Sequence, residues 1–276
     1  MIIDSHCHAW THWPYQPPVP DPASRGTLDQ LVFEMDQNGV DRAVIICAAI
    51  DHNPANTDDV VAAARRHGER IIPFADIDCR WSPTHQTPGG GQRLRAAAAR
   101  WKLRGFTHYL HEDRDAAWLV GDDGLALFRV AVELGLIASL ACSWRQMPII
   151  RRLAREFPTL PILVHHLARV RAPTEIDDVL AAATEPNIHI KFSGFGYASA
   201  EGWNFPCADM HGLARAIHDR FGADRLCWGS DYPVSRRYMT YRQSLEIVRR
   251  HCGFIAPAEM PAVLGGTMAR LLSGAA

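Results

Sequence analysis

The sequence predicts a single domain with the fold of a (β/α)8 TIM barrel, and three observations carry this prediction. Eight short apolar runs alternate strictly with eight amphipathic stretches, and such alternation produces a parallel sheet covered by helices. The chain has 276 residues, which is the size at which eight such units close into a barrel. The first run ends in His6-Cys7-His8, whereas an open doubly wound sheet usually has a Gly-rich phosphate turn there.

The elements follow one another in order along the chain. The predicted strands are residues 1–6, 42–50, 70–78, 103–110, 136–142, 161–168, 187–194 and 225–231. The helices predicted after them are residues 27–39, 56–68, 90–101, 124–135, 146–157, 174–184, 209–222 and 241–251, with a last helical segment at 257–272. Thr27 and Gly39 are the expected caps of the first helix, and Asn56 or Thr57 begins the second. No linker divides the chain, so the predicted domain spans residues 1–276.

Two of the loops that follow strands are long. Residues 10–25 are too rich in proline for a helix, and residues 79–91 read CRWSPTHQTPGGG. Loops of this type, at the carboxyl ends of the strands, carry the binding surface of a barrel. Both loops are therefore expected to border the site.

Composition excludes several classes of function. The formal net charge of -1 offers no basic surplus for nucleic acid or an anionic membrane, and no apolar run reaches transmembrane length. The N-terminus shows no signal peptide, and the seven cysteines form no C-x-x-C pair. Reduced thiols in the cytoplasm are therefore expected. The expected partner is a small-molecule substrate, and self-association into a homo-oligomer is left open.

Polar side chains gather where the predicted strands end. His6 and His8 close the first strand, where residues two apart share a face and Cys7 points the other way. Other strands contribute polar residues at or near their ends: His108, His165, His166, Lys191 and Asp231. Because the carboxyl ends of barrel strands converge on one mouth, this set suits a metal ion or a polar substrate. The alternative is a group of unrelated core residues, each satisfied by its neighbours.

The ordered set of motifs resembles the amidohydrolase superfamily, and its amidohydrolase-2 branch in particular. RLCWGSDYP is similar to the strand-eight signature of that branch, NIHIKFSG resembles its strand-seven motif, and ILVHHLAR resembles its strand-six motif. The nearest members are lactonases of the 2-pyrone-4,6-dicarboxylate, sulfomuconolactone and sugar-lactone type. The resemblance implies hydrolysis of a lactone ring, often one that carries a carboxylate.

Departures from the branch limit the metal site that the resemblance implies. Strand six reads His165-His166 where the group usually has Asp-His. The family role is assigned to His166 alone, because adjacent strand residues face opposite sides. Strand four offers no bridging lysine and strand five no histidine, so a binuclear site is not expected. One divalent metal, zinc or manganese, could bind His6, His8 and Asp231, and metal-free chemistry is the alternative.

The expected catalytic groups are Asp231 as the base that activates water, and His166 with the other histidines as stabilisers of the carbonyl oxygen. Arginines placed after strands could clamp a substrate carboxylate: Arg80, Arg145 and Arg169, with Arg236 and Arg237 as further candidates. Lys191 either assists in binding substrate or extends to the rim of the barrel. Tryptophans of the same loops could form an apolar wall: Trp10, Trp13, Trp81 and Trp144.

Two other functions compete with a lactonase. A metal-dependent decarboxylase of the same branch would usually supply a histidine from strand five, which is absent from LIASLACSW. A non-catalytic binding barrel would be expected to have lost its base, yet Asp231 and both residues of the H-x-H motif are present.

Overall fold

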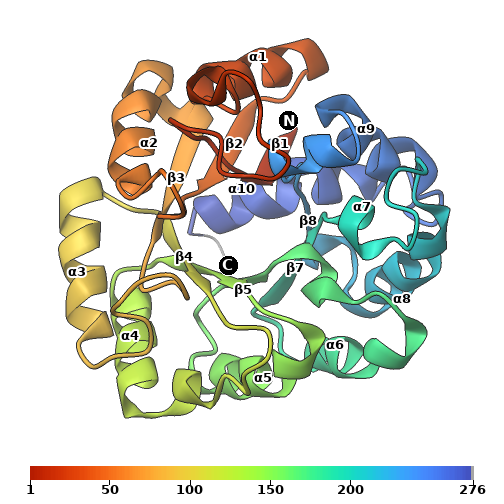
Figure 1. The fold of residues 1–276 in the computed structure, drawn as a ribbon. Helices are drawn as coiled ribbons and strands as arrows, with labels where there is room; N and C mark the ends of the chain where they lie inside the picture. Colours follow the sequence, from red (N-terminus) through yellow and green to blue (C-terminus); the bar gives the residue numbers. More distant parts are fainter. Residues whose placement is uncertain (275–276) are drawn as a thin grey trace.

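The predicted TIM barrel is present in the computed structural model, which describes residues 1–274. Eight strands pair in parallel in the order in which they occur in the chain, β1 to β8. The helices surround the strands on the outside (Figure 1). The predicted range of 1–276 includes residues 275–276, which lie outside the described residues.

The observed strands are shorter than predicted, and β2, β6 and β8 end three or four residues earlier, where the chain turns into the loops of the mouth. The strands are β1 Ile3–Cys7, β2 Arg42–Ile46, β3 Ile71–Asp76, β4 Gly105–Tyr109, β5 Ile137–Ala141, β6 Ile162–Val164, β7 Ile188–Phe192 and β8 Leu226–Trp228. The helices are α1 Leu28–Asn38, α2 Asn56–Ala64, α3 Gly90–Trp101, α4 Asp122–Glu133, α5 Met147–Glu156, α6 Asp177–Ala181, α7 Phe195–Ala198, α8 His211–Phe221, α9 Tyr241–Glu246 and α10 Thr267–Leu272.

Helix ends follow the predicted chemistry in α1 and differ in α2. The Thr27 side chain accepts a hydrogen bond from the Gln30 N–H, and Gly39 ends α1 in the left-handed conformation with φ 67°. In α2, Ala55 occupies the N-cap and Asn56 is the first helical residue. The Asn56 side chain instead bonds the backbone of Ala48 and Ala9, and so fastens the loop after β1 to the loop after β2.

Backbone hydrogen bonds join the segment after β8 to β1 and so close the ring. The Asp231 N–H donates to the His6 carbonyl at 2.8 Å, and the His8 N–H donates to the Tyr232 carbonyl at 2.6 Å. The polar residues that end β1 are therefore held directly beside those that follow β8.

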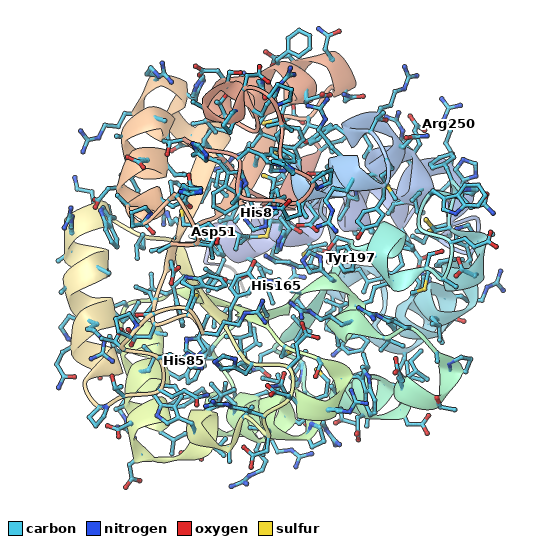
Figure 2. All side chains as sticks on the ribbon, viewed as in Figure 1. His8, Asp51, His85, His165, Tyr197 and Arg250 are labelled. Atoms are coloured by element: carbon cyan, nitrogen blue, oxygen red, sulfur yellow. The ribbon has the colours of Figure 1, made fainter. Side chains whose placement is uncertain are left out.

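The interior of the barrel has an apolar layer and a polar layer. Strand residues of the apolar layer pack against three side chains of α10; the cluster is Ile3, Val44, Ile46, Ile72, Phe74, Ile137, Leu163, Cys227, Met268, Leu271 and Leu272. The Thr267 hydroxyl donates to the Ala223 carbonyl before β8, so α10 covers the amino ends of the strands. The polar layer lies toward the carboxyl ends, and Figure 2 shows one of its members, His165, near the centre of the ring.

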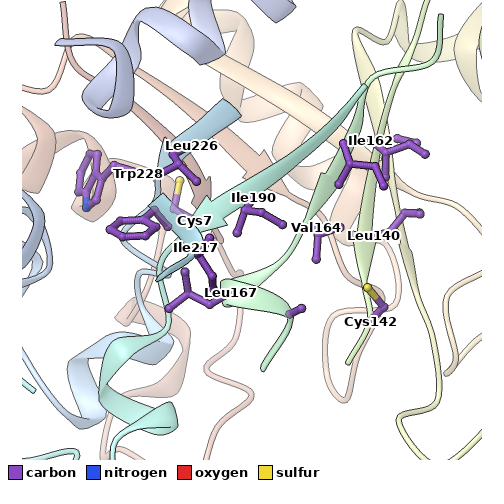
Figure 3. Packing of buried hydrophobic residues seen from close by; sticks show 14 of the residues in the cluster. Cys7, Leu140, Cys142, Ile162, Val164, Leu167, Ile190, Ile217, Leu226 and Trp228 are labelled. Carbon is purple, nitrogen blue, oxygen red and sulfur yellow. The ribbon is translucent and has the colours of Figure 1, made fainter. Parts of the chain in front are cut away.

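Outward-facing strand residues pack under the surrounding helices. Figure 3 shows this larger cluster around β5 to β8, with Leu140, Val164, Ile190 and Trp228 among its members. All seven cysteines are buried with free thiols. Among the described residues, none of the helices has both the length and the apolar character that a membrane crossing requires.

Candidate active site

A bulge in β1 determines where its two histidines point. Asp4 pairs with Ala43 and Cys7 pairs with Ile45, so β1 contains one residue more than β2 over this stretch. An extra residue reverses the alternation of side chains along a strand. Ile3 belongs to the interior cluster and Cys7 to the outer one, whereas strict alternation would have put both on the same side. The bulge thereby turns His6 and His8 into the barrel, as the sequence predicts.

His6, His8 and Asp231 bring three ligand atoms together in the mouth. The two Nε2 atoms are 3.3 Å apart, and each lies 3.4 Å from the Asp231 Oδ1. All three residues are buried. Two ligands of a tetrahedral zinc ion are expected about 3.3 Å apart, since each lies about 2.0–2.1 Å from the metal. The triangle therefore fits a single divalent ion.

The protonation of these histidines also suits a metal. The His8 Nδ1 lies 2.7 Å from the Ile46 carbonyl oxygen, to which only a protonated Nδ1 can donate, and in the neutral ring this tautomer leaves the Nε2 lone pair free. Burial lowers the pKa of His6 well below its ordinary value, and the nearby Lys191 lowers it further. Burial likewise lowers the pKa of His166 to about 4, against the opposing effect of Asp231. The imidazoles of His6 and His166 are thus neutral at pH 7 and can act as ligands.

His165 and His166 both approach His6, and the prediction that they must face opposite sides is wrong. Their ring centroids lie 4.5 Å and 4.3 Å from that of His6. The reason is that β6 ends at Val164, before either residue. Four consecutive residues without glycine then have positive φ: His166, Leu167, Ala168 and Arg169, at 50–57°. This left-handed turn is unfavourable for each residue and replaces the expected strand geometry.

The two neighbouring histidines have different environments. The His166 Nδ1 lies 2.8 Å from the Ser193 Oγ, and its Nε2 lies 3.9 Å from the Asp231 Oδ1. His166 also borders the open mouth. The His165 Nε2 contacts the Ser139 Oγ at 2.7 Å, below the mouth. His166 is therefore the member of the pair that can reach a substrate.

Lys191 lies beneath the site rather than at the rim. Its side chain is fully buried, and its Nζ lies 2.8 Å from the Ser139 Oγ and 3.1 Å from the His6 Nδ1. Burial lowers the pKa of Lys191 to about 7. Because the amine contacts the rear nitrogen of His6 and does not border the mouth cavity formed by the described residues, it can position His6 but cannot contact substrate there.

Asp4 fastens β1 to the segment after β8, which together carry His6, His8 and Asp231 (the triad), and no sequence motif indicates this role. Its carboxylate accepts hydrogen bonds from the Ser230 N–H at 2.9 Å, the Ser230 Oγ at 2.5 Å and the Tyr241 hydroxyl at 3.1 Å. Burial raises the pKa of Asp4 to about 6, although these hydrogen bonds oppose the rise. Asp231 itself has a positive φ of 55°, a conformation that this packing around β1 and β8 maintains.

His8 and Asp231 border a cavity of about 920 Å³ at the carboxyl ends of the strands. Both long loops contribute to its wall, as expected, through Trp10 and Trp81. Trp13 and Trp144 do not line it within the described chain. A cavity of this size accommodates a small organic molecule.

Arginines make the cavity cationic, though not all the predicted ones take part. The lining arginines are Arg80, Arg169, Arg171 and Arg237. Arg145 is exposed and lies over the Trp144 ring, 4.2 Å from its centroid. Among the described residues that line the cavity, neither Trp144 nor Arg145 is present, although both belong to the short 3-10 helix Trp144–Gln146 that follows β5. Guanidinium groups at the cavity favour an anionic ligand, since they form paired hydrogen bonds with carboxylates.

Four tyrosines that no sequence motif indicated also line the cavity: Tyr15, Tyr109, Tyr197 and Tyr238. Burial raises the pKa of the Tyr15, Tyr109 and Tyr197 hydroxyls well above its ordinary value, and Asp231 raises it further. These three hydroxyls therefore remain protonated and can donate hydrogen bonds. The Tyr197 ring lies beside the His166 ring, with their centroids 5.3 Å apart. The places of these tyrosines, at a strand end or in the loops that follow, are the signal that could have identified them.

His108 faces away from the mouth, in contrast to the expectation for strand four. Its neighbour Tyr109 lines the cavity, so His108 points outward between β3 and β4. The His108 ring stacks between His85 and Trp118, with centroid distances of 5.3 Å and 5.8 Å. Figure 2 shows His85 well away from His8. His108 therefore belongs to the packing of the barrel wall.

Comparisons with known proteins identify the family of the chain and relatives that share its fold. A family model described as amidohydrolase matches residues 3–273. The chain is 27% identical over 292 residues to an L-fucono-1,5-lactonase of Burkholderia ambifaria, which covers 96% of this chain and 92% of that protein. An amidohydrolase structure from Burkholderia multivorans with bound zinc has a TM-score of 0.77 at 22% identity, and 99% of both chains is covered.

A second solved structure shares the fold over the same extent. It is a probable 2-pyrone-4,6-dicarboxylic acid hydrolase from Acinetobacter baumannii with citric acid bound, with a TM-score of 0.74, 18% identity and 99% of both chains covered. Because the family model spans almost every described residue, from β1 to beyond α10, the chain belongs to the amidohydrolase family.

Proposed function

We propose that this amidohydrolase opens the ring of a lactone that carries a carboxylate group. The observation that carries the proposal is the cavity itself, in which a buried carboxylate and imidazoles lie below a wall of arginines. The identity to an L-fucono-1,5-lactonase supports the reaction class, and the guanidinium groups support an acidic substrate.

In the proposed mechanism, Asp231 is the base. Its carboxylate orients a water molecule toward the lactone carbonyl and takes a proton as the water oxygen bonds to that carbon. The bond between the carbonyl carbon and the ring oxygen then breaks, and the same proton passes from Asp231 to the leaving oxygen. The neutral His166 and the hydroxyls of Tyr109 and Tyr197 donate hydrogen bonds to the oxygen atoms that become more negative.

A divalent metal held by His6, His8 and Asp231 would act as a Lewis acid toward the carbonyl oxygen. Two nitrogen ligands and one oxygen ligand suit zinc or manganese. Lys191 contributes by fixing the His6 ring from behind. Arg80 and Arg169 bind the substrate carboxylate at the cavity wall.

The test is to replace Asp231 with asparagine, which is nearly isosteric but cannot accept the proton. Turnover of an acidic lactone should fall by at least about 10²-fold, with an unchanged circular dichroism spectrum. Asp51→Asn is the matched control, because this exposed carboxylate borders the same cavity. Retention of more than a few per cent of the activity by Asp231→Asn contradicts the assignment, and carbon dioxide release in place of ring opening identifies a decarboxylase instead.

A further inference from the structure

Arg169 occupies a special place among the cavity arginines. It ends the left-handed turn after β6, with a φ of 57°, and its side chain is only 18% exposed. Burial lowers the pKa of Arg169, and the nearby Arg80 lowers it further. A guanidinium in this position needs a compensating negative charge.

Glu112 provides that charge from the loop between β4 and α4. The Glu112 Oε1 pairs with the Arg169 Nη1, and the Glu112 side chain is 48% exposed. The other three lining arginines, Arg80, Arg171 and Arg237, form no ion pair within residues 1–274. Arg169 is therefore the cavity arginine whose guanidinium has a fixed carboxylate partner in the described structure.

Glu112 contacts the Arg169 guanidinium from the side that faces away from the cavity. Among the described residues that line the cavity, Arg169 and His111 are present and Glu112 is not. The carboxylate thus approaches the guanidinium from outside the cavity. A guanidinium has five N–H donors in a planar fork, so a carboxylate at one edge leaves donors on the other edges free to face a ligand.

We infer that Glu112 is a positioning residue that holds Arg169 in the orientation needed to bind the substrate carboxylate. The inference rests on the proposed function in that it assigns a determinant of its specificity. Without Glu112, the long Arg169 side chain gains rotameric freedom, and part of the binding energy is lost in ordering it. Glu112 thereby favours the binding of acidic ligands over neutral ones, although it contacts neither kind of ligand itself.

Binding of citrate, a tricarboxylate, tests the inference without turnover. Isothermal titration calorimetry of Glu112→Gln should show binding weakened about two- to tenfold, as for the loss of one partly exposed ion pair. Asp113→Asn is the matched control, since this neighbouring carboxylate forms no ion pair in the described chain, and it should bind citrate like the unsubstituted protein. In an Arg169→Gln background, Glu112→Gln should have no further effect.

A kinetic measurement separates positioning from a general structural effect. With an acidic lactone, Glu112→Gln should raise KM more than it lowers kcat. Tighter citrate binding by Glu112→Gln would mean that Glu112 competes with the ligand for Arg169, which overturns the inference. So does additivity with Arg169→Gln, or the absence of citrate binding by the unsubstituted chain. If no lactone is hydrolysed but the calorimetric results hold, the proposed function fails and the positioning role stands.

Discussion

Replacing His108 with asparagine should make the fold less sensitive to acid. His108 is fully buried on β4, with its Nδ1 2.9 Å from the Ile77 carbonyl oxygen. Burial lowers the pKa of His108 from 6.5 to about 4, because the imidazolium cannot be hydrated there. The hydrogen bond to Ile77 and the Asp78 carboxylate oppose this effect, while His85 adds to it.

The magnitude follows from the difference between the folded and unfolded pKa values. In the unfolded chain this imidazole binds a proton near pH 6.5, whereas in the folded chain it stays neutral until about pH 4. The contribution to stability is therefore complete above pH 6.5 and is lost as the pH falls toward 4. Since one pKa unit corresponds to about 1.4 kcal/mol, His108 lowers the free energy of unfolding by about 3 kcal/mol over this range.

Urea denaturation at a series of pH values measures the effect. Asparagine does not titrate, and its amide N–H can replace the hydrogen bond to Ile77. The difference in unfolding free energy between His108→Asn and the unsubstituted protein should be constant above pH 7. It should shift by about 3 kcal/mol in favour of the variant at about pH 4. An equal loss of stability in both proteins on acidification would contradict the role assigned to His108.

The site and its supports give three more predictions. His8→Ala should retain less than one zinc ion per chain after dialysis, because one corner of the ligand triangle is removed; retention equal to that of the unsubstituted chain, measured by elemental analysis, rejects the ligand set. Arg80→Met should raise KM for an acidic lactone about tenfold, as for loss of a charge-assisted pair, whereas the same change at the exposed Arg145 should not; equal effects would place both at the substrate. Gly229→Ala would put a Cβ 2.8 Å from the His6 Cβ. The midpoint of thermal denaturation of this variant should therefore fall, by the equivalent of about 1–3 kcal/mol. An unaltered midpoint would show that β1 can move aside.

The sequence allowed the barrel to be predicted because the relevant signals are local. Apolar periodicity identifies each strand and helix, and the caps at Thr27 and Gly39 mark the ends of α1. The direction of the strands then brings His6, His8 and Asp231 to one mouth without any knowledge of packing. The spacing of the triad agrees with that reasoning.

The features of the site that could not be predicted depend on contacts between distant segments of the chain. No sequence pattern indicates a left-handed turn of four residues without glycine, so the approach of His165 to His6 could not be predicted. The bulge in β1 reverses the alternation of side chains along the strand. Only for that reason does His6 point into the barrel, as predicted. The burial of Lys191 likewise depends on neighbours from other elements, Ser139 and His6.

The contact between β1 and the segment after β8 also determines when the site is completed during synthesis and folding of the chain. Almost the whole chain lies between His8 and Asp231, so a ribosome releases the two histidines long before it releases the aspartate. Until then β1 has an open edge, and the ligand triangle lacks its carboxylate. Contacts so distant in sequence slow folding, and an unpaired strand edge favours association with other chains. Until the ring closes, newly made protein therefore has an incomplete site and an unpaired edge on β1, and the same hydrogen bonds complete both.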